Sequence, residues 1–322
     1  MTSAQIQSMT ALTVADLRGN AKRVRRESAV RWMLIGCAMV SIVISALIVG
    51  TLFREAWTFI TGLSRESGLG ALIDRGARPG WYPRDGRFDL ATIVLGTLIV
   101  AAVAMVVAAP LGLGAAIFLS EYARPGARRW LKPIIEMLAS IPSVVLGFFA
   151  IRFLGPSIVQ PLFDTTASKN LLVTGLAVGV LVTPLMASIT EDALRSVPHS
   201  LREASYGVGA RKSVTTIKIV LPAAVSGIVA AFILAISRAI GETMIAALAS
   251  GALGQASRTT NPTDTGLTMT AAMAQVATGT DNVAGSGLAF QSLFFVGAVL
   301  FVITLALNTI GDRFVQRIRT RY

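Results

Sequence analysis

Six long stretches of the chain are apolar and nearly free of charged residues, and most are separated by short basic segments. A helix that crosses a bilayer needs about 20 consecutive apolar residues, because its backbone polar groups must pair within the segment itself. The stretches cover roughly 32–53, 90–119, 134–154, 171–189, 223–249 and 288–310. They predict an all-α integral membrane protein with about six transmembrane helices.

The composition excludes several other classes of protein. Hydrophobic residues make up 53% of the 322 and charged residues only 14%, against about 25% charged in a typical soluble domain. The net charge of +12 does not indicate nucleic-acid binding, because the basic residues lie beside the apolar stretches and not on one soluble face. With one cysteine and one histidine, the chain offers no metal site, no cofactor site and no catalytic constellation.

The distribution of lysine and arginine predicts the topology, because these residues favour the cytoplasmic ends of membrane helices. They concentrate in the tails 1–31 and 312–322, in the second-to-third connection and in the loop 190–222, whereas the fifth-to-sixth connection has only Arg258. Both termini are therefore expected in the cytoplasm, on a multi-pass chain of a bacterial inner membrane. A first membrane helix 32–53, an external loop 54–89 and a core 90–311 with five further membrane helices complete the predicted organisation. The loop carries six arginines among five acids, against the rule, and is expected to pack as a small cap.

The cytoplasmic connection before the fifth apolar stretch predicts a compact helical element. Ser200 and Glu203 have the spacing of a capping box at a helix start. Gly209 has the position of a residue that ends such a helix, and Pro222 lies where the next helix would begin. A short helix, a turn and a return to the bilayer follow, which a partner protein could push.

This connection resembles the "EAA" loop of ABC importer permeases. The residues that match the loop's spacing are Glu203, Ala204, Ser205 (in place of alanine), Gly209, Ile219, Leu221 and Pro222. The resemblance implies the architecture of a type I importer permease, with a cytoplasmic coupling helix that docks on an ATP-hydrolysing subunit. The segment Gly209-Ala-Arg-Lys-Ser lacks the glycine before the lysine that a phosphate-binding loop requires. The chain is therefore expected to be a transport subunit and not an enzyme.

Three further motifs resemble the phosphate-specific transport (Pst) permeases: Ser120-Glu-Tyr-Ala123, Ser140-Ile-Pro-Ser-Val-Val-Leu-Gly147 and Arg238-Ala-Ile-Gly-Glu-Thr-Met244. The resemblance runs from about residue 88 to the C-terminus, and segments 268–272 and 293–308 look more like the PstC subunit than its PstA paralogue. It implies a PstA-like permease partner, two PstB-like ATP-binding subunits, an external PstS-like phosphate-binding protein, phosphate as substrate and contact with membrane lipid. A sulfate or molybdate permease, the PstA-like subunit, a stand-alone channel and a regulatory subunit are the alternatives.

Arg238 and Glu242 are the only charges deep in the fifth apolar stretch. A charge at this depth costs at least ~2.5–3.5 kcal/mol, and two helical residues four apart can pair on one face. Because a guanidinium binds phosphate through two parallel N–H bonds, we expect these residues in the substrate pathway. A permanent structural ion pair is the alternative.

Three local features predict helix irregularity or close packing. Pro110 suggests a kink or an end in the second stretch, and Pro142 a break in the third. Gly175 and Gly179 place two small residues on one face of the fourth stretch, which favours close contact with another helix.

Overall fold

The structure is a computed structural model that describes residues 21–66, 68–73, 79–252, 255–278 and 287–319. The chain divides into two units, Met1–Thr51 and Leu52–Tyr322. Helix α2 (Ala21–Glu66) begins in the first unit and continues into the second.

The first unit contributes a long apolar part of α2, and most of its described side chains from residue 27 onward are exposed within this chain. A helix covers the predicted stretch 32–53, but it is longer than predicted at both ends. The predicted tail 1–31 is helical from Ala21, residues 1–20 lie outside the described part, and the predicted loop 54–89 begins as helix up to Glu66. The helix continues because Ala56, Phe59 and Leu63, on one face, are buried in the second unit.

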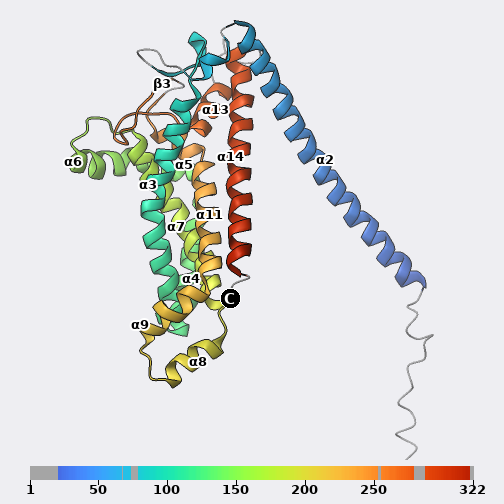
Figure 1. The fold of residues 1–322 in the computed structure, drawn as a ribbon, viewed down its shortest axis with the longest axis vertical. Helices are drawn as coiled ribbons and strands as arrows, with labels where there is room; N and C mark the ends of the chain where they lie inside the picture. The colour runs from blue at the N-terminus through green and yellow to red at the C-terminus, as the bar shows by residue number, and fades with distance from the viewer. Residues whose placement is uncertain (1–20, 67, 74–78, 253–254, 279–286, 320–322) are drawn as a thin grey trace, which may run out of the picture. The chain divides into compact units, whose positions relative to one another are not determined.

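The second unit is built on four helices that lie side by side: α3 (Leu90–Ile117), α7 (Leu171–Arg195), α11 (Val225–Ile240) and α14 (Leu288–Arg319). Helix α7 packs on α3 and α11, and α11 packs on α14 (Figure 1). Their contacts are filled mainly by alanine, valine and leucine. Helix α3 runs through Pro110 without ending, so the predicted end at this proline is wrong.

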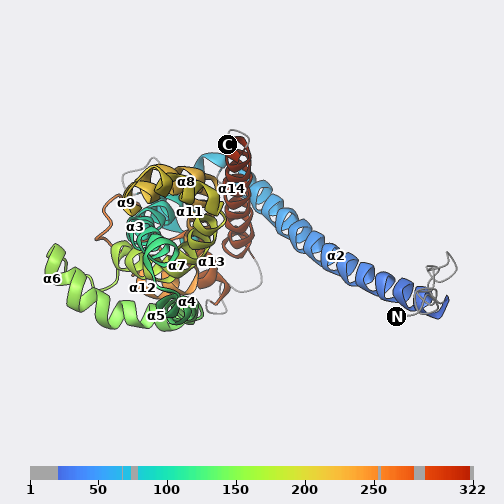
Figure 2. The same cartoon turned by 90° about the horizontal axis from the view of Figure 1, so that it is seen from below.

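The third apolar stretch is divided as predicted at Pro142, which is the residue before a new helix. Helix α4 (Pro125–Ala139) ends before it, and α5 (Ser143–Phe149), the π-helix η4 (Ala150–Val159) and α6 (Gln160–Phe163) follow. The membrane-length segment is therefore 143–163 and not 134–154. Figure 2 shows α5, η4 and α6 curving away from the four-helix bundle.

The fifth apolar stretch differs most from the prediction, because 223–249 is not one helix. The segment Lys212–Ala223 bends by 70° into α11. This segment comprises α9 (Lys212–Thr215), the π-helix η5 (Thr216–Val220) and α10 (Leu221–Ala223). At its other end α11 stops at Ile240, and the short α12 (Met244–Ala249) begins after three residues. The described residues hold five helices long and apolar enough to cross a membrane, or six with the bent pair counted as one span.

A small antiparallel sheet forms the end of the second unit where α3 and α14 begin, here called the sheet end (Figure 1). Its strands, in the order β2-β1-β3, are Arg87–Phe88, Gly80–Tyr82 and Ala256–Ser257. Trp81 pairs with Phe88 on one side and Ala256 on the other. Two 3-10 turns, η1 (Leu69–Leu72) and η2 (Pro83–Asp85), precede β1 and β2, and α13 (Met269–Ala277) follows β3.

Aromatic packing attaches this sheet to the helices. The ring of Phe59 lies 5.1 Å from that of Phe88 and 5.0 Å from that of Phe295 on α14, centroid to centroid. Trp81 packs edge-on against Phe88 at 5.8 Å. The predicted cap is confirmed for the described residues, and it draws its third strand from the distant connection after α12. The sheet is a small addition to a fold that is otherwise helical.

The close helix contact predicted at Gly175 and Gly179 is confirmed. A Cβ at Gly175 would lie 2.5 Å from the Cβ of Val103, and one at Gly179 would lie 2.9 Å from the backbone oxygen of Ala104. Both glycines therefore allow α7 to approach α3.

We expect Gly179→Leu to destabilise the protein by about 1–3 kcal/mol, the usual cost of overpacking a filled core. The readout is the midpoint of thermal unfolding in detergent. Gly114→Leu is the matched control, because Gly114 is exposed on α3 and no atom lies within 4 Å of its added Cβ. Equal midpoints for the two variants would contradict the proposed contact.

Candidate functional site

Arg238 and Glu242 form an ion pair where α11 ends. The Arg238 Nη1 lies 3.0 Å from the Glu242 Oε2. Arg238 is in the last turn of α11, but Glu242 lies beyond the helix, in the break before α12. The predicted pairing is therefore present, although the two residues do not share one helix face.

The Glu242 carboxylate is held in place by its surroundings. Its Oε1 accepts hydrogen bonds from the backbone N–H groups of Met244 (3.2 Å) and Ile245 (3.4 Å), which begin α12. A negative charge is favourable at such a helix start. The Glu242 backbone oxygen accepts a hydrogen bond from the Thr270 hydroxyl at 2.7 Å. Glu242 is thus fixed between α12 and α13.

Arg238 is freer than its partner. Its side chain is 48% exposed, against 3% for Glu242. Within the described part of the chain, Glu242 is the only acidic residue that pairs with it. A guanidinium has five N–H donors, and the exposed part of the Arg238 side chain leaves donors open to the solvent. An anion that enters from this side can therefore compete with Glu242 for the guanidinium.

The second candidate site is the loop at the opposite end of the bundle from the sheet, here called the loop end (Figure 1). Its first helix, α8 (His199–Gly207), starts after Pro198. The predicted capping box is wrong, because Ser200 lies inside the helix and no side chain caps its start. The helix begins two residues earlier than predicted. Pro198 has extended backbone angles and takes the N-cap position, so the first helical residue is His199.

Gly209 ends α8 as predicted. Its φ angle is +79°, a left-handed conformation that favours glycine. The N–H of Gly209 bonds the Tyr206 oxygen at 2.9 Å and the N–H of Ala210 bonds the Ser205 oxygen at 3.1 Å, which is a Schellman motif. The chain then turns sharply into α9.

The seven motif residues of the loop fall into three sets by exposure. Glu203, Ala204, Gly209 and Pro222 are exposed, and Ile219 and Leu221 are partly buried. Ser205 is buried, and its hydroxyl lies 2.8 Å from that of Thr215 on α9. The serine at the third motif position therefore holds the two short helices together, and the exposed residues form the surface open to a partner.

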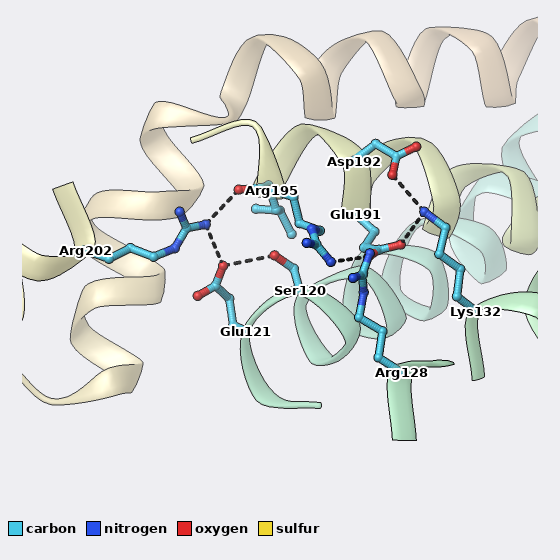
Figure 3. Close-up of polar contacts among 9 residues, drawn as sticks. Ser120, Glu121, Arg128, Lys132, Glu191, Asp192, Arg195 and Arg202 are labelled. Carbon is cyan, nitrogen blue, oxygen red and sulfur yellow. Dashed lines mark hydrogen bonds and ion pairs between the residues drawn. The ribbon is translucent and has the colours of Figure 1, made fainter. Parts of the chain in front are cut away.

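Two ion-pair clusters lie near the loop end, and neither was predicted from the sequence (Figure 3). In the first, the fully buried Glu191 near the end of α7 contacts two cations of α4: Arg128, with its Nε at 2.8 Å, and Lys132, with its Nζ at 3.0 Å. Lys132 also bonds Asp192 at 2.8 Å. This cluster holds α4 against α7.

Lys132 keeps its charge in this cluster. Burial lowers its pKa, but its hydrogen bonds to Asp192 and Glu191, with their negative charges, outweigh burial and raise the pKa above its ordinary value of 10.5. The stabilisation is therefore present at neutral pH and is lost only as the pH rises through the raised pKa.

The second cluster joins Arg202 of α8 to Glu121, which lies in the π-helix η3 (Phe118–Tyr122) that extends α3. The Arg202 Nη2 is 2.9 Å from the Glu121 Oε1. Neither cluster could be found from the sequence, because the paired residues lie 63 and 81 positions apart.

The sheet end has an ion pair of its own. Arg258 donates to both oxygens of the fully buried Asp89, with its Nε at 3.1 Å and its Nη2 at 2.6 Å. The Thr92 hydroxyl also donates to Asp89. This pair connects the strand after α12 to the start of α3.

We expect Arg258→Ala to destabilise the protein by about 3 kcal/mol, the lower end of the range for leaving a buried charge without its partner. The lower end applies because the Arg258 side chain is 28% exposed. Thermal unfolding in detergent measures the change. Arg84→Ala is the matched control, since Arg84 is an exposed arginine in η2 at the same end; an equal loss in that variant would show that the pair has no special role.

The helical bundle with its projecting loop defines a class, the membrane-spanning component of an ABC importer. Two solved structures share this fold. A methionine ABC transporter in an inward-facing conformation is 20% identical and matches 71% of this chain and 93% of its own, with a TM-score of 0.51. A bacterial transporter involved in the import of alginate is 13% identical and matches 92% and 99%, with a TM-score of 0.59.

The chain belongs to the family of binding-protein-dependent transport system inner membrane components, whose model matches residues 108–322. The phosphate transport system permease protein PstC of Mesorhizobium japonicum is 32% identical over 260 residues, covering 75% of this chain and 77% of the relative. The probable ABC transporter permease protein YqgH of Bacillus subtilis is 31% identical over 250 residues, covering 74% and 77%. The protein is a multi-pass membrane protein.

Proposed function

We propose that this chain is the PstC-like permease subunit of an ATP-driven phosphate importer. It forms part of the translocation pathway and is coupled to ATPase subunits through residues 200–222. The observation that carries the proposal is the loop at the end of the bundle, in which α8 and its left-handed Gly209 present Glu203 and Ala204 to a partner. The names of the relatives support phosphate as the substrate.

An ABC importer permease works with a second permease, ATP-hydrolysing subunits and a binding protein. For this chain we assign these roles to a PstA-like permease, two PstB-like ATPases and an external PstS-like phosphate-binding protein. The loop end then faces the cytoplasm, as do both termini, and the sheet end faces the binding protein. The basic residues of the loop end support this orientation, because lysine and arginine favour the cytoplasmic side.

Transport then proceeds by alternating access. Closure of the ATPases on their nucleotide displaces α8, and the helices attached to it open the pathway towards the cytoplasm. Arg238 exchanges its partner Glu242 for the passing phosphate and returns to Glu242 after release. The exposed guanidinium and the anchored carboxylate support this exchange.

The test is co-expression of the chain with the three partner types, co-purification, and uptake of radiolabelled phosphate into proteoliposomes with ATP inside and binding protein outside. We expect ATP-dependent uptake that excess sulfate or molybdate does not reduce. Competition by either oxyanion would instead assign the permease to that substrate. Phosphate flux through vesicles that contain this chain alone would indicate a channel.

A further inference from the structure

The Arg202 side chain joins three segments at the loop end. It belongs to α8, yet it is only 11% exposed and points towards the bundle (Figure 3). Besides its ion pair with Glu121, its Nη1 donates to the backbone oxygen of Val197 at 2.6 Å, and its Nη2 donates to that of Leu194 at 2.8 Å. One guanidinium thus bonds α8 to the end of α7 and to η3.

The C-terminal end of α7 presents backbone oxygens that a cation can bind. The last carbonyl groups of a helix have no partner within the helix, and they carry its partial negative charge. Leu194 lies in the last turn of α7, and Val197 follows two residues after its end. Arg202 satisfies both oxygens, so α8 is bonded to α7 by more than apolar contact.

Glu121 is the third partner of Arg202, and it lies in η3, which extends α3. We call the contacts of Arg202 with Leu194, Val197 and Glu121 the joint at Arg202. The Glu121 carboxylate is 5% exposed and also accepts a hydrogen bond from the Ser120 hydroxyl at 3.0 Å. It lies in a five-residue π-helix, and such short π-segments often occur at functional sites. The sequence motif Ser120-Glu-Tyr-Ala123 therefore provides the acidic residue that binds Arg202. It belongs neither to the proposed phosphate pathway nor to the exposed docking surface.

The segments bonded to Arg202 are themselves tied to the bundle. Glu191, one turn before the end of α7, is bound by Arg128 and Lys132 of α4. Nearly one turn further along the buried face of α8, the Ser205 hydroxyl contacts that of Thr215. A displacement of α8 is therefore passed to α3 and α7 at Arg202, and through α7 to α4.

We propose that Arg202 and Glu121 are positioning residues for energy coupling, and that their pair makes α8 and the bundle helices α3 and α7 move as one body. The proposal rests on the docking of α8 to an ATPase. Apolar contacts alone allow helices to slide past one another. Separating the atoms of a buried, charge-assisted hydrogen bond, in contrast, has a free-energy cost from the first displacement. Without the pair, ATP hydrolysis continues but drives fewer transport events.

The test uses the complete complex in proteoliposomes and measures phosphate taken up per ATP hydrolysed. Glu121→Gln removes the charge and leaves the bonds of Arg202 to Leu194 and Val197, so α8 keeps its local attachment. We expect the ratio to fall at least about fivefold, the lower end of typical coupling between two sites. Subunit co-purification and the rate of ATP hydrolysis, which a loss of assembly would lower, should stay close to wild type. The midpoint of thermal unfolding is expected to fall, because the buried Arg202 loses its charged partner.

Arg195→Gln is the matched control. Arg195 is in the same last turn of α7, but it is 47% exposed and lies 4.0 Å from Glu191. Its loss should leave the ratio unchanged. An unchanged ratio in assembled Glu121→Gln complex would overturn the proposal. If that variant does not assemble, Glu121→Asp decides in the same way, because it keeps the charge but withdraws it by about 1.5 Å, one carbon–carbon bond.

The outcome separates this proposal from the proposed function. If the wild-type chain does not co-purify with an ATP-hydrolysing subunit, the proposed function fails. If it does and transports phosphate, but loss of the Glu121 charge leaves the ratio intact, only the joint at Arg202 fails.

Discussion

Phosphate uptake is expected to fall about 10- to 100-fold when Arg238 is replaced by glutamine, because a hydrogen bond to a charged group contributes about 1.5–3 kcal/mol and tenfold corresponds to about 1.4 kcal/mol. The neutral amide cannot supply the two parallel, charge-assisted N–H bonds that a guanidinium offers to a phosphate. The measurement is the initial rate of ATP-driven uptake by complexes matched for subunit content.

The single variant also leaves the buried Glu242 carboxylate without its cation, so a structural effect must be separated from a direct one. The double variant Arg238→Gln, Glu242→Gln removes both charges. The amide introduced by Glu242→Gln keeps a side-chain oxygen for the N–H groups of Met244 and Ile245, which Glu242 now binds. We expect the double variant to assemble normally and to remain inactive. Recovery of uptake in it would show that the pair has only a structural role.

Glu203→Arg should abolish co-purification of the ATPase and uptake together. Glu203 is exposed on α8, and its side chain has the position at which the coupling loop meets its partner in our proposal. Reversing a charge in an interface places like charges together and costs several kcal/mol, so we expect at least about a 100-fold loss of binding. Subunit content after affinity purification, followed by uptake, measures the effect.

His199→Ala is the control for this experiment, because His199 is also exposed on α8 and lies outside residues 200–222. It should behave as wild type. If the Glu203→Arg complex assembles and is active, the proposal that this loop docks on the ATPase is wrong. A chain misfolded by the substitution would be recognised by a lower midpoint of thermal unfolding, which an exposed position should not cause.

The membrane class of this protein and the plan of its loop were predictable because both depend on local chemistry. Long apolar runs at 90–119, 171–189 and 288–310 match α3, α7 and α14, since each spanning helix must satisfy its own backbone. Gly209 was identified as the end of α8 because a left-handed residue at a helix end favours glycine wherever it occurs. The spacing from Glu203 to Pro222 predicted a coupling role for this loop only through its resemblance to the EAA motif.

Local rules failed where the structure depends on neighbours distant in sequence. The apolar run 223–249 contains a 70° bend and a break. A distant contact, the hydrogen bond from the Thr270 hydroxyl to the Glu242 backbone oxygen, lies at the break. The capping box at Ser200 was wrong because Pro198 starts α8 earlier. Helix α2 continues past Phe53 because its face at Phe59 and Leu63 is buried within the second unit.

The amino-acid sequence by itself determined that this chain crosses a membrane several times and that a helix ending at Gly209 precedes its fifth apolar stretch, because hydropathy and helix-end signals act over a few turns of chain. Only the tertiary structure decided which charges meet. Asp89 and Arg258 are 169 positions apart, and Glu121 and Arg202 are 81 apart. Many arginines of this chain could have paired with either acid. The packing of α3, α7 and α8 brings Arg202 to Glu121 and the sheet brings Arg258 to the start of α3, since an ion pair depends on distances that only the folded chain sets.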